Sequence, residues 1–220
     1  MEALAKEKMD NGKFSEAVSV LTEIIKNEAP SATIYNMRGV AYYNLNKNAN
    51  ALTDFDNAIS LDTSDYRFFY NRGNVKRTLN RPESAVEDYN KAIQLETEEY
   101  ELFLNRALSL MAANNLKASI EDFNRAEVLS KGKDDKVFFY RGKALMITEE
   151  FNKALDNFTK CIEVNPNNGE AFFGKALAKI NLANGTADDE TCIDIDRSIA
   201  LGYIPARSLK GSYCKKSEKE

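Results

Sequence analysis

A repeat of 34 or 35 residues is the feature that most constrains how this chain can fold. One marker is an aromatic residue that recurs at intervals of 34, 34 and 35 residues, at Phe55, Tyr89, Phe123 and Phe158. A second marker lies upstream and keeps the same intervals, at Arg38-Gly39, Arg72-Gly73, Arg106-Ala107 and Arg141-Gly142. Two independent markers with one period indicate a repeat protein built from copies of a single supersecondary unit.

Within each copy, the apolar residues have the spacing of amphipathic helices. The clearest stripe follows i, i+4, i+7 and i+8 along Ala85, Tyr89, Ala92 and Ile93. Turn residues separate pairs of helices at 46–48 and 80–82, and Pro82 suits the first turn of a helix. Because a single hairpin of this kind cannot bury its own apolar face, we expect the hairpins to stack around a continuous core.

The pattern resembles that of the tetratricopeptide repeat (TPR) family. Family members place large residues at positions 4, 11 and 24 of the repeat and small residues at positions 8, 20 and 27. The second copy supplies this set as Tyr35, Gly39, Tyr42, Ala51, Phe55 and Ala58, whereas the third has Lys76 where an aromatic residue is usual. The resemblance implies an all-α fold, a right-handed α-solenoid of about six antiparallel helix hairpins with a C-terminal capping helix.

The resemblance also sets the expected boundaries, with one solenoid domain over residues 1–214. The repeats cover approximately 1–30, 31–64, 65–98, 99–133, 134–167 and 168–202, followed by a capping helix at 204–214 and a polar tail at 215–220. Residues 193–203 resemble the closing hairpin of Sel1-like proteins, in which cysteines at comparable places can be bridged. A reducing compartment would instead keep Cys192 and Cys214 as thiols, and the sequence leaves both alternatives open.

The residue inventory excludes most catalytic chemistry. The chain has no His and three Cys without a C-x-x-C pair, which removes most zinc sites and every His-based general acid or base. We therefore predict no enzyme, no catalytic residue, no metal and no cofactor. The net charge of -4 and the scattered basic residues argue against nucleic acid as a partner.

No apolar run of membrane-spanning length occurs, so we expect no membrane insertion. Residues 1–7 lack the basic and apolar pattern of a signal peptide, which favours a cytoplasmic location. The alternative is an exported bacterial protein whose signal peptide is not part of this sequence.

In TPR proteins the first helix of each hairpin lines a concave groove, so the resemblance implies a protein or peptide segment as partner. Asn side chains can donate and accept hydrogen bonds along an extended main chain, and aromatic rings supply contact area. The residues expected in the groove are Asn36, Arg67, Tyr70, Asn71, Asn74, Arg77, Leu104, Asn105, Leu108, Lys136, Phe139, Tyr140, Lys143 and Phe173. The alternative is that some of these positions are buried between neighbouring hairpins.

Three further interpretations bear on function. The repeated Arg has an Asp 16 residues later in three copies, which favours a structural ion pair between two helices over an anion-binding ladder. Tyr70 and Tyr140 stand where the TPR clamp for chaperone tails has cations, and this argues against such a clamp. The alternative function is a self-associating structural or assembly protein, a dimer through apolar helix faces, so monomer and weak homodimer both stay open.

Overall fold

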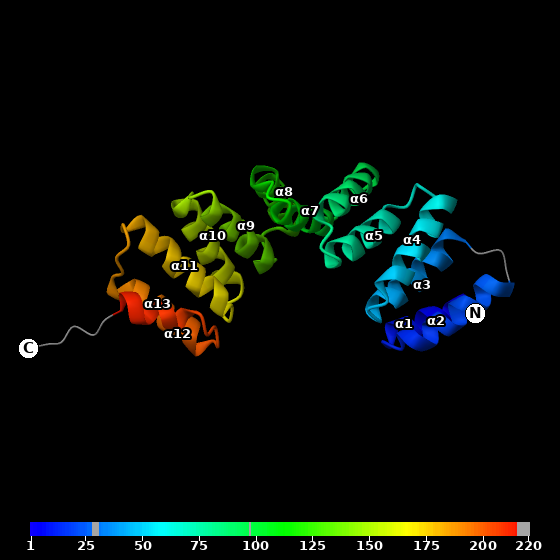
Figure 1. Cartoon of the computed structure of the whole chain (residues 1–220), viewed down its shortest axis with the longest axis horizontal. Helices are drawn as coiled ribbons and strands as arrows, with labels where there is room; N and C mark the ends of the chain where they lie inside the picture. Colours follow the sequence, from blue (N-terminus) through cyan, green and yellow to red (C-terminus); the bar gives the residue numbers. More distant parts are fainter. Residues whose placement is uncertain (28–30, 97, 215–220) are drawn as a thin grey trace, which may run out of the picture. The chain divides into compact units, whose positions relative to one another are not determined.

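The computed structural model describes residues 1–27, 31–96 and 98–214, and these hold thirteen helices and no strand (Figure 1). The all-α class is confirmed. The polar tail predicted at 215–220 lies outside the described residues.

Contacts within the chain separate it into two compact units, Met1–Ala113 and Asn114–Glu220. The first unit contains α1 (Glu2–Asp10), α2 (Phe14–Asn27), α3 (Ala32–Asn44), α4 (Asn48–Leu61), α5 (Tyr66–Thr78), α6 (Pro82–Leu95) and α7 (Tyr100–Ala112). The second contains α8 (Leu116–Ser130), α9 (Asp135–Ile147), α10 (Phe151–Val164), α11 (Gly169–Leu182), α12 (Asp189–Ala200) and α13 (Ala206–Tyr213). A single domain over 1–214 stays a prediction.

The turn inside each hairpin depends on one residue in the left-handed backbone region. Asn46 and Asn80 take φ of 57° and 56° in the turns before α4 and α6. Asn tolerates this conformation better than most residues with a side chain, which explains its recurrence at the repeat period. Glu149 occupies the same position before α10 with φ of 60°, although its side chain gives no such advantage.

In three of the hairpins the core contains an aromatic ring that faces a glycine. Phe55 and Phe158 are each 1% exposed. A Cβ atom placed on Gly39 would lie 2.7 Å from the ring of Phe55, and one on Gly142 would lie 2.9 Å from the ring of Phe158. The two helices can therefore approach closely only because the residue at position 8 is small, as the repeat pattern predicts.

The repeated arginines make the predicted structural ion pairs in the first unit. Arg38 donates to both carboxylate oxygens of Asp54 at 2.8 and 2.7 Å, and Arg72 donates to those of Asp88 at 3.0 and 2.6 Å. Both aspartates are 2% exposed. Each pair joins the two helices of one hairpin, α3 to α4 and α5 to α6.

The C-terminal end is closed by α13, which begins at Ala206 and packs on α12. Ala206, Ile195 and Ile180 are buried together in this closing cluster. A disulfide joins Cys192 of α12 to Cys214 directly after α13, with the two Cα atoms 5.7 Å apart. Of the two alternatives that the sequence leaves open, the structure has the bridged one.

Candidate peptide-binding surface

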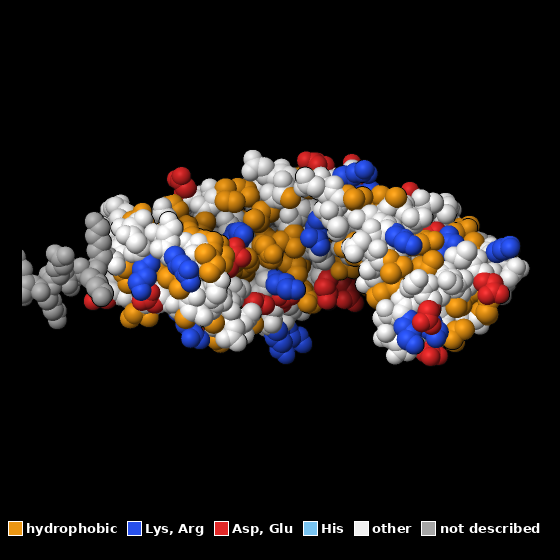
Figure 2. Space-filling view, turned by 60° about the horizontal axis from the view of Figure 1, so that its bottom comes forward, with side chains coloured by type: hydrophobic (Ala, Val, Ile, Leu, Met, Phe, Trp, Pro, Cys, Tyr) orange, Lys and Arg blue, Asp and Glu red, His pale blue; other side chains and the backbone are white. Residues whose placement is uncertain are grey.

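In each unit, the first helices of successive hairpins contact one another directly. This holds for α3 with α5, for α5 with α7, and for α9 with α11. We call the side formed by these helices the A-helix face of each unit, made of α3, α5 and α7 in the first unit and of α9 and α11 in the second. Figure 2 shows basic, acidic and hydrophobic side chains interspersed over the surface in view. The fourteen predicted groove residues all lie on helices of the A-helix face.

Two hydrogen bonds join predicted groove residues of successive A helices in the first unit. Asn71 Nδ2 donates to Asn36 Oδ1 at 2.8 Å, and Asn105 Nδ2 donates to the Tyr70 hydroxyl at 3.1 Å. Each bond joins residues 35 apart in the chain. The structure therefore brings four of the predicted residues together as a ladder, which we call the amide ladder.

The amide ladder changes what each Asn can offer to a ligand. Asn105 Nδ2 also donates to the carbonyl of Glu101 at 2.9 Å, so both of its N–H bonds are used. Its Oδ1 is left as an acceptor, whereas Asn71 keeps one N–H beyond its bond to Asn36. Neighbouring repeats thus hold the two amides in fixed orientations with opposite hydrogen-bonding character.

A tyrosine of the core makes a hydrogen bond to one of the predicted groove residues. Tyr89 of α6 donates its hydroxyl to Asn74 Oδ1 at 2.7 Å, and its ring centroid lies 6.2 Å from that of Tyr70. Burial raises the pKa of Tyr89, and the positive charge of Arg77 opposes this rise. The repeat pattern assigns Tyr89 to the core alone, because it specifies a ring at that position and says nothing of the hydroxyl.

In the second unit the A-helix face has a different character. Lys143 Nζ lies 5.2 Å from the ring centre of Phe139 and 5.9 Å from that of Tyr140, and it pairs with Glu170 at 3.1 Å. Beside it is a hollow of about 330 Å³ whose lining includes the predicted residue Phe173. This part of the face is an aromatic and aliphatic surface edged by one ion pair.

The predicted groove residues differ in how much of their surface is exposed. Leu104 and Phe139 are each 7% exposed, so these two residues are buried, as the alternative interpretation of the groove positions expects. Their apolar side chains gain more from packing than from contact with water. Arg67 donates to Asp65 at the N-terminus of its own helix, at 2.9 and 3.0 Å. Leu108 is partly buried, and Lys136 is exposed.

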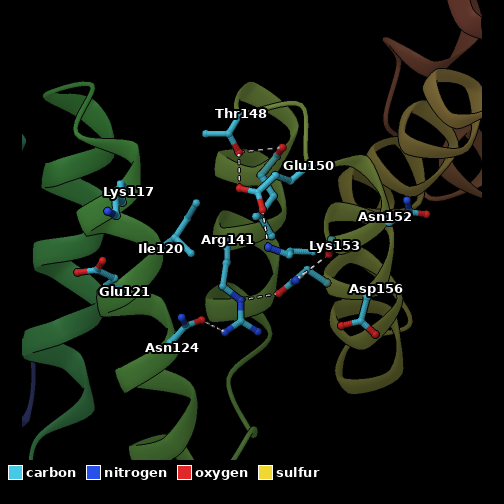
Figure 3. Close-up of a pocket in the computed structure, with 12 residues that line it drawn as sticks. Lys117, Ile120, Glu121, Asn124, Arg141, Thr148, Glu150, Asn152, Lys153 and Asp156 are labelled. Carbon is cyan, nitrogen blue, oxygen red and sulfur yellow. Dashed lines mark hydrogen bonds and ion pairs between the residues drawn. The ribbon is translucent and has the colours of Figure 1, made fainter.

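A larger hollow lies away from all of the predicted residues. It has a volume of about 940 Å³ and is lined by residues of α8, α9 and α10, together with Thr148 and Glu150 of the α9–α10 turn. Figure 3 shows Arg141 of α9 inside it, with Asn124 of α8 to one side. The only sequence signal for this site is Asn157, which replaces the Asp of the other copies.

Arg141 nevertheless has partners within the second unit. It donates to Asn157 Oδ1 at 2.6 Å and to Asn124 Oδ1 at 2.7 Å, and Glu127 pairs with it at 2.6 Å. The rest of the lining carries two lysines, Lys117 and Lys153, and three acidic residues, Glu121, Glu150 and Asp156. The guanidinium of Arg141 is therefore already engaged by side chains of its own unit.

Other chemistry has little support in the part of the chain that the structure describes. That part contains no group of three or more His, Cys, Asp or Glu residues placed to hold a metal. Burial raises the pKa of Cys161 to about 12, which makes it a poor nucleophile. None of the described helices is long and apolar enough to cross a membrane.

Comparison with protein families identifies the repeat. One tetratricopeptide repeat model matches residues 2–66 and 70–134, and a second matches 136–168. The chain belongs to the tetratricopeptide repeat family. These matches end at residue 168, so the Sel1-like character of 193–203 stays a prediction. A search of curated proteins found no match.

Solved structures share the fold at low identity. The C-terminal part of a TPR repeat-containing protein from Cytophaga hutchinsonii has a TM-score of 0.78 and 21% identity, covering 96% of this chain and 83% of that one. YrrB, described as a TPR protein with an unusual peptide-binding site, has a TM-score of 0.74 and 22% identity, covering 87% of this chain and 97% of that one. MamA from Desulfovibrio magneticus has a TM-score of 0.71 and 19% identity, covering 76% of this chain and 94% of that one. These likenesses confirm the α-solenoid fold class.

Proposed function

We propose that this protein is a non-enzymatic scaffold that holds an extended segment of a partner protein on the A-helix face of its first unit. The observation that carries the proposal is the amide ladder, in which Asn36, Tyr70, Asn71 and Asn105 are tied together between successive repeats. TPR proteins bind protein or peptide partners, and the likeness to YrrB, a TPR protein with an unusual peptide-binding site, supports a peptide as the ligand class.

The ladder suits an extended main chain for a physical reason. An extended segment presents N–H and C=O groups in alternation, and it needs acceptors and donors that are already in place. Asn105 supplies an acceptor and Asn71 a donor, and each is held by a neighbouring repeat. Because these side chains are ordered before the ligand arrives, binding costs less conformational entropy.

Affinity capture with two matched variants tests the proposal. The first variant, Asn71→Ala with Asn105→Ala, removes the ladder but keeps Asn74, whose loss would leave the buried Tyr89 hydroxyl without its acceptor. The control, Asn50→Ala with Asn57→Ala, removes two amides from α4, the second helix of its hairpin. All three proteins are immobilised at equal amount after their melting curves have been compared.

We expect the wild type and the α4 control to retain the same segments from a host lysate. The ladder variant should bind those segments about tenfold more weakly or worse, which corresponds to about 1.4 kcal/mol for two lost contacts. Equal retention by all three proteins would show that the ladder is not the binding surface.

Location is part of the proposal, and the disulfide bears on it. Disulfides persist in oxidising compartments and are rare in the cytosol. The bridge between Cys192 and Cys214 therefore favours the exported alternative over the cytoplasmic prediction. Thiol titration of the protein isolated from its native source, alkylated at lysis, distinguishes the two locations by whether this pair reacts.

Self-association is a second proposal, favoured by one observation in the second unit. Ile147 is 58% exposed and lies at the hollow beside Lys143. A symmetric dimer could cover this apolar surface. Sedimentation over a range of concentrations tests the idea, since strictly monomeric behaviour at high concentration would eliminate it.

A further inference from the structure

The fifth repeat departs from the third at two positions that meet in the large hollow of the second unit. The third repeat has Lys76 and Asp88 at these positions. The fifth has Leu145 and Asn157, and both of them line the hollow of about 940 Å³ between α8 and α10, which we call the α8–α10 hollow. The fifth repeat therefore lacks one positive and one negative charge at this place, while it keeps the repeated arginine as Arg141.

The change from Asp to Asn removes a hydrogen-bond acceptor from the arginine. In the second repeat, Arg38 Nη2 donates to Asp54 Oδ1 at 2.7 Å. A carboxylate offers two acceptor oxygens, whereas an amide offers one. Asn157 Oδ1 accepts from Arg141 Nε at 2.6 Å, and its Nδ2 is itself a donor, bonded to the carbonyl of Lys153 at 2.8 Å. The fifth repeat thus has no equivalent of the bond to Nη2.

The other partners of Arg141 do not replace this acceptor. Nη1 donates to Asn124 Oδ1 at 2.7 Å and to Glu127 Oε2 at 2.6 Å. Among the residues that the structure describes, none accepts from Nη2, although Arg141 is only 6% exposed and lines the α8–α10 hollow (Figure 3). Glu127 therefore balances the charge of Arg141 and leaves two buried N–H bonds unused, and an unmade hydrogen bond of a buried group is costly.

The charge balance of the α8–α10 hollow restricts which acceptor fits there. Three cations and three carboxylates line it. Arg141 is paired with Glu127, and Asp156 is paired with Lys160 at 3.0 Å. A second carboxylate at Arg141 would lack a second cation, because Leu145 replaces the lysine of the third repeat. An uncharged acceptor, such as a main-chain carbonyl, adds no charge that would have to be paired.

The lining also indicates what carries the carbonyl. Leu145 is 2% exposed, and Ile120 packs against the same apolar cluster. The α8 residues of the lining extend from Lys117 to Asn124, which is about 10 Å at 1.5 Å per residue of helix. This length corresponds to about three residues of extended chain. The hollow therefore suits a short extended segment with an aliphatic side chain.

We infer that the α8–α10 hollow is a second docking site, which binds a short uncharged aliphatic segment of a partner protein. A main-chain carbonyl of the segment accepts from Arg141 Nη2, and an aliphatic side chain contacts Leu145 and Ile120. The site lies in the second unit and uses second helices of the repeats. It is therefore separate from the amide ladder and goes beyond the proposed function.

An NMR titration with two peptide pools tests the inference. The neutral pool consists of acetylated and amidated hexapeptides of Leu, Ile, Val, Ala and Ser, and each peptide of the acidic pool has one Glu in place of Ser. The signals followed are the methyl groups of Ile120 and Leu145 and the Nε–H of Arg141. Changes in α3, α5 and α7 report binding at the amide ladder, so the two sites are judged separately in the same spectra.

Two variants close the site in different ways. Asn157→Asp restores the carboxylate of the second and third repeats, which takes up both Nε and Nη2, and Asn181→Asp adds the same charge at an exposed residue of α11 as its control. Glu121→Trp fills the hollow from an exposed residue of α8, and Glu163→Trp on α10, outside the lining, is its control. Melting curves establish folding, and if Asn157→Asp does not fold, Glu121→Trp decides the test alone.

We expect the neutral pool to shift all three signals in the wild type and in the two controls. Half-saturation should need about tenfold more peptide in Asn157→Asp and in Glu121→Trp, because one loses the free donor and the other the space. The acidic pool should bind the wild type about tenfold more weakly than the neutral pool.

Three outcomes overturn the inference. If the neutral pool shifts none of the three signals in the wild type, the hollow is not a docking site, whatever happens in α3, α5 and α7. Equal half-saturation in the wild type and in the folded variants would show that neither the free donor nor the space matters. Tighter binding of the acidic pool would identify an anion site and contradict the uncharged acceptor.

Discussion

Asp88 forms ion pairs with two cations of α5. It accepts from Arg72 at 3.0 and 2.6 Å and pairs with Lys76 at 2.8 Å, although only 2% of it is exposed. Lys76 replaces the aromatic residue that the repeat pattern expects, and its charge finds a partner in the same aspartate. At the residue scale, one buried carboxylate thus accommodates a departure from the family pattern.

The first prediction concerns this carboxylate. Asp88→Asn leaves Arg72 and Lys76 without their buried charge partner, and we expect the free energy of unfolding to fall by about 3–5 kcal/mol. The control Asp56→Asn removes a carboxylate that also pairs with Arg72, at 2.7 Å, but is 61% exposed; it should cost less than about 1 kcal/mol. Urea unfolding followed by circular dichroism measures both, and similar losses would contradict the burial argument.

The second prediction concerns Glu149. Its φ of 60° is costly for a residue with a long side chain, whereas Asn adopts the same conformation at Asn46 and Asn80. We expect Glu149→Asn to stabilise the protein by about 0.5–1 kcal/mol and to raise the melting temperature by a few degrees. The exposed helical residue Glu163 provides the comparison, since Glu163→Asn should be neutral or destabilising. A lower melting temperature for Glu149→Asn would count against strain at this turn.

The third prediction concerns the cysteines. Burial raises the pKa of Cys161 to about 12, so its thiol stays protonated at pH 8 and should not react in the folded protein. Cys192 and Cys214 are bridged. A thiol reagent at pH 8 should therefore find no thiol in the native protein, one after unfolding, and three after unfolding with a reductant. Three thiols without reductant would contradict the bridge.

Among the elements, α13 depends most on a covalent link. It has eight residues, of which only Ala206 is buried, and helices this short are marginal without tertiary support. The disulfide attaches its C-terminal end to α12, across a separation of 22 residues. The closing helix therefore covers Ile195 and Ile180 by virtue of both packing and the bridge.

The fourth prediction follows at this scale. The double change Cys192→Ser and Cys214→Ser should lower the free energy of unfolding by about 2–4 kcal/mol, because the unfolded chain gains freedom. Amide hydrogen exchange should rise in α13 before it rises in α11. Cys161→Ser serves as the control that changes a cysteine without touching the bridge. Unchanged exchange in α13 would show that packing alone holds the closing helix.

At the scale of the whole molecule, the sequence predicted the parts that repeat. The turns at Asn46 and Asn80, the ring of Phe55 against Gly39, and the bond from Arg38 to Asp54 all recur with the period, so spacing alone locates them. The resemblance to the family implied that Asn36, Asn71 and Asn105 share one face, although it did not show that hydrogen bonds already tie these repeats together.

What the sequence could not predict depends on features that break the period. Glu127 neutralises Arg141 from a neighbouring helix, because Asn157 carries no charge. Leu104 and Phe139 are buried, and their burial depends on local packing that the position of a residue in the repeat does not determine. The bridge between Cys192 and Cys214 depends on the redox state of a compartment as well as on distance.

The most direct test of peptide binding on the A-helix face is a backbone amide NMR titration of the wild-type protein with a segment retained in the capture experiment. We expect the largest shift changes in α3, α5 and α7, centred on Asn71, Asn74 and Asn105, with little change in α4 and α6. Shift changes confined to α4 and α6, or to the second unit, would contradict the proposal that the amide ladder holds the partner.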